Sequence, residues 1–146
     1  MGTHPTEKNP FQEVLDDHKV LKALLAKIDE TLGQRKATVA EATELLNQLA
    51  DQLIGHFALE ESGGYFTEAI LHAPHLAARS NTLMGQHDGL SMAARALAAP
   101  TGKGADAWWE ETRSRFVKFQ QELLLHERSE DELLQTAYVD DLGNKD

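Results

Sequence analysis

The chain has 146 residues, of which 41% are hydrophobic and 26% charged, proportions typical of a single globular domain rather than a disordered chain. Its 24 acidic and 14 basic residues give a formal net charge of −10, which argues against nucleic acid or an anionic membrane as a partner. The lack of cysteine excludes disulfides, thiolate metal sites and a cysteine nucleophile, and no apolar stretch is long enough to span a bilayer; we expect a cytoplasmic protein.

The first half of the chain predicts two long amphipathic helices. The first begins at Asn9-Pro10, a capping residue followed by proline, and ends at Gly33. Its apolar positions recur at helical spacing: Val14, Leu21, Leu25, Ile28 and Leu32. The second helix begins at Thr38, which forms a capping-box pattern with Glu41, and ends near Gly63-Gly64. Its apolar positions are Ala42, Leu45, Leu49 and Leu53.

The second half predicts two further helices after a long connection, residues 64–79, which contains Pro74. We expect a short helix within this connection, because its apolar side chains need burial: Tyr65, Phe66, Ile70 and Leu71. The third helix is expected over Ser80–Ala99, before Pro100, with apolar positions Leu83, Leu90, Ala94 and Leu97. The fourth begins near Asp106 and ends near Ala137, with apolar positions Trp109, Phe116, Phe119, Leu123, Leu133 and Ala137.

These elements predict an all-α protein. No segment alternates β-branched and polar residues, and short links between long helices favour antiparallel neighbours. We therefore expect one domain over residues 1–146, an up-down-up-down four-helix bundle with flexible tails at 1–8 and 139–146. Of the adjacent Trp108 and Trp109, only Trp109 fits the apolar face and is expected in the core.

Polar residues interrupt each of the four apolar faces where a bundle would place leucine. They keep the helical spacing and are His18, His56, Glu60, His87, His126 and Glu130. At a rise of about 1.5 Å per residue, His18 and His56 differ in height by only about 4–5 Å in antiparallel helices. The same arithmetic puts His87 and His126 in that layer, near the end of the bundle where the first helix begins.

A buried layer of four imidazoles and two carboxylates needs compensation. Without it, the layer would cancel most of a domain stability of ~5–15 kcal/mol. A pair of divalent cations compensates it, since imidazoles offer lone pairs and carboxylates can bridge two ions. His56/Glu60 and His126/Glu130 are both His-x-x-x-Glu pairs, whose side chains share one helix face. The mix of imidazole and oxygen donors without sulfur suits iron or manganese better than structural zinc.

At these residues the chain resembles the hemerythrin-like, or HHE cation-binding, domain family. The resemblance covers nearly the whole chain and rests on Asp17-His18, His56-x-x-x-Glu60, His87 and His126-x-x-x-Glu130. It implies a four-helix bundle that holds two iron ions bridged by an oxo or hydroxo group, with manganese or zinc as substitutes. By that resemblance the four histidines are terminal ligands, and Glu60 and Glu130 bridge the ions.

The chain departs from the oxygen-carrying members in its third helix. Those members have a second histidine one turn from the third-helix ligand, where this chain has Leu83 and Ser91. They also place an aspartate five residues after the last histidine, and Asp131 stands there, so it is the alternative to Glu130. The four-histidine, two-glutamate set is more similar to di-iron proteins linked to iron-centre repair and nitric oxide handling, although those carry a cysteine-bearing N-terminal segment.

Five other polar residues are expected to lie outside the metal centre. Glu61 is an alternative ligand, although we expect it to be solvated. His72 and His75 are expected at the surface, with a lid, an entry path or a third metal site as the alternative. Tyr65 is expected to pack rather than to donate a hydrogen bond at the edge of the centre, and His4 lies in the N-terminal tail.

The resulting hypothesis is a non-haem di-iron protein that binds a small diatomic or peroxide ligand at an open bridged centre, such as oxygen or nitric oxide. Sensing, iron or oxygen handling and stress response are the roles this suggests. One alternative is a redox enzyme that reduces nitric oxide or peroxide or repairs iron centres, and a second is a metal-free helical interaction module. The sequence allows a monomer or a homodimer and an unidentified protein partner.

Overall fold

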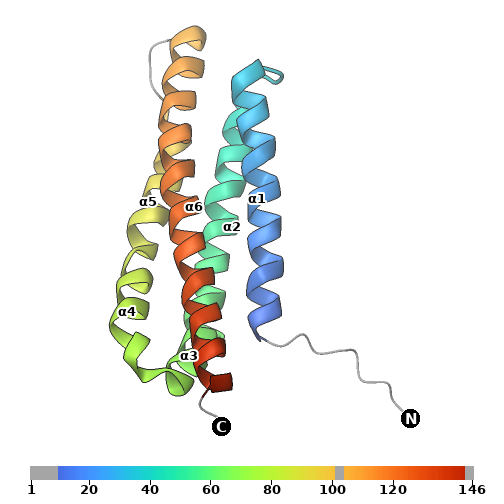
Figure 1. Ribbon diagram of the computed structural model, residues 1–146. Helices are drawn as coiled ribbons and strands as arrows, with labels where there is room; N and C mark the ends of the chain where they lie inside the picture. Colours follow the sequence, from blue (N-terminus) through green and yellow to red (C-terminus); the bar gives the residue numbers. More distant parts are fainter. Residues whose placement is uncertain (1–9, 101–103, 144–146) are drawn as a thin grey trace, which may run out of the picture.

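The computed structural model describes residues 10–100 and 104–143, and within them the chain is helical without strands. The elements in order are α1 (Pro10–Gln34), α2 (Val39–Ser62), α3 (Tyr65–His72), a 3-10 turn (Pro74–Leu76), α4 (Ala77–Gly85), α5 (His87–Leu97) and α6 (Ala105–Gly143). α1, α2 and α6 each form one rod of the bundle, and α4 and α5 follow one another to form the third rod in chain order. Figure 1 shows that consecutive rods run alternately up and down. The predicted all-α four-helix bundle is confirmed.

Neighbouring rods pack in the order α1, α2, α5 and α6, and α6 closes the ring against α1. The short α3 lies across the end of the bundle and packs against α6, α2 and α4 (Figure 1). None of the helices in the described ranges is long and apolar enough to cross a membrane.

The helix boundaries follow the sequence signals where a cap defines them. The Thr38 side chain accepts a hydrogen bond from the backbone N–H of Glu41 (3.1 Å), and Glu41 Oε1 accepts one from the N–H of Thr38 (3.2 Å), so the predicted capping box is present. Gly64 then turns the chain from α2 into α3 at φ 81°, a conformation that glycine adopts without strain. Asn9, the predicted cap of the first helix, lies outside the described residues.

The third rod differs from the single helix expected over Ser80–Ala99. It begins at Ala77 and is interrupted at Gln86, whose backbone N–H bonds to the carbonyl of Leu83 (3.1 Å) in a tightened turn. The last helix was also predicted too short, since α6 continues past Ala137 to Gly143 and so occupies part of the segment expected to be a tail.

The buried positions differ from the predicted ones at three places. In α2 the unpredicted Leu46 is fully buried along with Leu49 and Leu53, whereas the predicted Leu45 is half-buried and packs against the edge of the core. In α3, Phe66 is buried but Leu71 is 76% exposed. Trp108 and Trp109 are both buried, since their rings pack edge to face with centroids 5.1 Å apart and together cover more than one face of α6.

The apolar core consists of two separate clusters. One fills the end of the bundle near the α1–α2 turn and includes Leu25, Leu49, Phe116 and Leu123. The other lies at the opposite end, around α3, and includes Val14 and Leu133. The four bundle rods pass from one cluster to the other through a layer of buried polar residues.

Candidate metal centre

Seven titratable side chains, each at most 2% exposed, form the polar layer between the two apolar clusters. They come from all four rods and are His18 on α1, His56 and Glu60 on α2, His87 on α5, and His126, Glu127 and Glu130 on α6. The structure thus brings together all six residues that the sequence singled out and adds Glu127.

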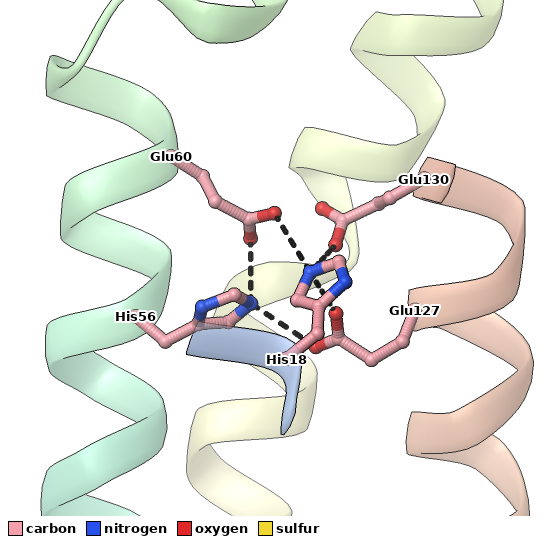
Figure 2. Close-up of side chains that lie close together, drawn as sticks. All are labelled: His18, His56, Glu60, Glu127 and Glu130. Carbon is pink, nitrogen blue, oxygen red and sulfur yellow. Dashed lines mark ion pairs between the residues drawn. The ribbon is translucent and has the colours of Figure 1, made fainter. Parts of the chain in front are cut away.

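These side chains form two overlapping groups of candidate metal donors. His18, His56 and Glu127 belong to one group, and His87 and His126 belong to the other, while Glu60 and Glu130 belong to both. Within each group, the donor atoms lie within 4.8 Å of one another. Figure 2 shows the side chains of the first group pointing toward one another from α1, α2 and α6.

Glu60 and Glu130 occupy the middle of the layer. Glu60 Oε1 lies 3.3 Å from His56 Nε2 and 3.4 Å from His87 Nε2, so this carboxylate contacts both groups. Glu130 Oε2 lies 3.1 Å from His126 Nε2, and its Oε1 lies 3.7 Å from His18 Nε2. Two carboxylates that each face two groups of imidazoles are the arrangement expected of bridging ligands.

A second set of residues contacts the histidines from outside through their other ring nitrogen. The Nδ1 atom of His18 lies 2.8 Å from Asp131, and that of His126 lies 2.7 Å from Gln86. The Nδ1 atom of His87 lies 3.3 Å from Glu61, and that of His56 contacts Asp17. Oxygens that accept a hydrogen bond from Nδ1, as at His56 and His126, favour a proton on that nitrogen and leave the Nε2 lone pair facing the centre. Metal-binding histidines are commonly oriented in this way. The contact between His18 and Asp131 is an ion pair without hydrogen-bond geometry, and His87 has a contact of hydrogen-bond geometry at each ring nitrogen.

Asp131 and Glu61 therefore lie outside the inner layer. Asp131 contacts the outer face of the His18 ring, and Glu130 occupies the inner position, so the geometry favours Glu130 over Asp131 as a bridging donor. The Glu61 side chain is 53% exposed, and its Oε1 contacts the outer nitrogen of His87.

The His-x-x-x-Glu pattern does not predict Glu127 as a donor, because this residue directly follows His126 and stands at the first spacer position of the pair. Its Oε2 lies 2.5 Å from His18 Nε2, and its Oε1 lies 3.2 Å from His56 Nε2. A sequence signal did exist, because position 134, seven residues later on the same side of the helix, is a leucine; the structure buries it as it buries Glu127. The buried face of this helix is wider than the strict heptad seam.

The remaining predicted residues lie away from the centre. His72 and His75 are exposed, as expected, and neither belongs to a donor group in the described residues. Leu83 is buried in the apolar cluster around α3, and Ser91 is half-buried. His4 and the side chain of Tyr65 lie outside the described part of the chain.

An aromatic ring also orients the centre. Phe57 is 3% exposed and stacks on His87, with ring centroids 3.9 Å apart and planes within 5° of parallel. It meets His126 edge to face at 5.5 Å. Phe57 thus covers one face of the His87 ring and contacts the neighbouring His126 ring, which fixes the orientation of these rings.

The electrostatics of the layer show that its charges need compensation. Burial lowers the pKa of His18, but contacts with Asp131 and Glu127 outweigh it and raise this pKa above 6.5. Burial and the nearby charge of Glu130 raise the pKa of Glu60, whereas contacts with His126, His18 and His87 lower that of Glu130 despite its burial. In the metal-free protein, protons on some of these groups therefore take the place of positive ions.

This arrangement predicts a pH dependence for the metal-free protein. The folded chain retains protons on His18, His56 and Glu60 that the unfolded chain releases, because all three pKa values are raised. Stability should therefore fall as the pH rises from about 6 to about 9, while Glu130, whose pKa is lowered, contributes equally across that range. Thermal melts of chelator-treated protein measure this, and a midpoint that rises across the range would contradict it.

The donor chemistry fits a pair of cations better than a network of hydrogen bonds. Several inner atoms have no hydrogen bond of good geometry, among them Nε2 of His18, His56 and His126 and both oxygens of Glu60 and Glu127. These atoms face one another as imidazole–carboxylate pairs, and a buried polar atom left without a well-formed hydrogen bond costs about 1–3 kcal/mol. Metal ions in the two groups would satisfy these atoms together.

Comparison with known proteins supports the same chemistry. The sequence matches the hemerythrin HHE cation binding domain over residues 9–138, nearly the whole chain. No curated protein and no solved structure shows a significant match.

Proposed function

The chain belongs to the hemerythrin HHE cation-binding domain family, and on that premise we propose that it binds two iron ions, one in each donor group. The observation that carries this proposal is that the two groups share Glu60 and Glu130 and no other residue. Shared carboxylates bring two ions close together and offset part of their charge. Manganese and zinc are the competing ions for the same donors.

We further propose that the ion pair binds a small diatomic or peroxide ligand, such as oxygen or nitric oxide. When bound, the iron supplies Lewis acidity and electrons for that ligand. The chain itself holds the imidazoles in one orientation through Asp17, Asp131, Gln86 and Glu61, and the two apolar clusters keep bulk water from the layer. Sensing, iron or oxygen handling and stress response are the roles we propose for such a centre.

Metal analysis of the purified protein tests the first step. We expect about two irons per chain after anaerobic loading with ferrous iron, and near-ultraviolet charge-transfer bands after oxidation. Parallel loading with manganese and zinc ranks the competing ions. Fewer than two irons per chain, or the spectrum of a single isolated ion, would contradict a shared centre.

Mixing the loaded protein with nitric oxide or peroxide tests the second step. A stoichiometric spectral change that then persists supports ligand binding. Steady consumption of the added molecule would instead identify a redox enzyme, which is the alternative activity for the same donors.

A further inference from the structure

The two donor groups are unequal, and the inequality lies in Glu127. The group around His18 and His56 contains five residues, whereas the group around His87 and His126 contains four. Building on the proposed di-iron centre, we propose that Glu127 is a terminal ligand of the ion held by His18 and His56. The ion held by His87 and His126 then has the open position, and the small ligand binds there.

The contacts of Glu127 point to one side of the centre. Its two oxygens approach the inner nitrogens of His18 and His56, and it is absent from the group that contains His87 and His126. The side chain is 2% exposed, and neither oxygen has a hydrogen bond of good geometry. A buried carboxylate requires a positive charge close to it; the protonated His18 ring supplies this charge in the metal-free layer, and an ion held by His18 and His56 would supply it in the loaded protein.

A surface pocket leads to the other side of the centre. It has a volume of about 340 Å³, lies among α2, α3 and α4, and is lined by residues that include Glu60, Glu61, Phe66, Ile70, Ser80 and Met84. Glu60 and Glu61 are the two carboxylates that contact His87 from α2, one at each ring nitrogen. The pocket therefore ends at the wall of the centre formed by Glu60 and Glu61, on the side where these residues contact His87, and the Glu60 oxygens behind that wall are buried.

A second pocket, of about 380 Å³ between α1 and α6, does not reach the inner donors in the same way. Its lining includes Lys22, Ala26 and Asp131, and Asp131 contacts only the outer nitrogen of His18. Of the two pockets, only the one among α2, α3 and α4 has an inner donor, Glu60, in its wall, and Glu61 beside it contacts His87 of the four-residue group. Ligand access and the open position coincide at the His87 ion.

The role of Glu127 is tested by titrating the metal-free protein with cobalt(II), whose visible spectrum reports its coordination, and by counting azide bound to the iron-loaded protein. We expect wild type to bind two ions and one azide per ion pair. In Glu127→Gln, one of the two metal dissociation constants should rise by about tenfold or more. Glu127→Ala should weaken the same ion further and admit a second azide.

Glu122→Gln and Glu122→Ala, which change an exposed glutamate on the same helix, are the matched controls and should behave as wild type. Metal constants and azide counts in the Glu127 variants equal to those in the Glu122 variants would overturn the assignment of Glu127. Failure of wild type itself to bind two ions would instead overturn the proposed function, so the two failures are distinguishable.

The access route is tested with one substitution placed in each pocket. Ala77 lines the pocket beside His87, and Ala26 lines the pocket between α1 and α6. Ala77→Trp should slow azide association several-fold with two irons still bound, while Ala26→Trp should leave the rate unchanged. Slowing in Ala26→Trp alone, or in neither variant, would overturn the route.

Discussion

Replacement of Glu60 by alanine should abolish binding of the metal pair, because this residue belongs to both donor groups. Its Oε1 contacts both His56 and His87, whereas each of those histidines contributes to one group only. Glu60→Ala should therefore leave fewer than one iron per chain, and His87→Ala should affect chiefly the four-residue group. Metal analysis after anaerobic loading and the charge-transfer spectrum after oxidation measure the difference.

Two further variants distinguish a direct loss of metal binding from a loss of the fold. Glu60→Gln keeps the size of the side chain and removes the charge, and far-ultraviolet circular dichroism shows whether each variant keeps its helices. His72→Ala changes an exposed histidine outside both donor groups and should keep both irons. A Glu60→Ala protein that still binds two irons would show that this carboxylate is not shared.

The inward direction of the histidines followed from the sequence because it depends on local geometry. Helical spacing fixes which side of a rod a residue faces, and a constant rise per residue fixes its height. His18 and His56 therefore met across antiparallel helices as the residue count required, with ring centroids 4.9 Å apart. Errors of a few residues at the helix ends do not change the face of a residue, so they left this conclusion intact.

The contacts outside the inner layer did not follow from the sequence, because they depend on how one rod is rotated against its neighbour. Asp17 stands next to His18 in the sequence but contacts His56 on α2. Gln86 contacts His126 on α6 from the turn that interrupts the third rod. A periodic pattern in one helix does not report such pairs.

Glu127 could be predicted from the sequence only in part, unlike the inner histidines, which could be predicted, and the outer contacts, which could not. Its inward position follows from the spacing of apolar residues in α6 only if the buried face of the helix includes Leu134, which the structure shows to be buried. How wide a helix face is buried depends on the number and tilt of the neighbouring rods. The packing of α1 and α2 against α6 decides it here, because Glu127 contacts one histidine on each of them.

Removal of the metal should lower the thermal midpoint of the protein substantially. An ion bound only by the folded chain adds about 4 kcal/mol when its free concentration is about 1,000 times its dissociation constant. For a domain of this length, losing that contribution lowers the midpoint by on the order of 10 °C. Thermal melts of iron-loaded protein with and without a chelator measure the change.

The size of this change should depend on pH, because protons partly replace the ions in the metal-free layer. At about pH 6, protons held by His18, His56 and Glu60 compensate the remaining carboxylates, and the chelated protein retains much of its stability. At about pH 8 the cost of holding those protons is greater, so chelation should lower the midpoint further.

Glu60→Ala should melt at the same temperature with and without chelator. A wild-type midpoint that ignores the chelator at both pH values would favour a metal-free interaction module, because the buried donors would then be satisfied within the chain.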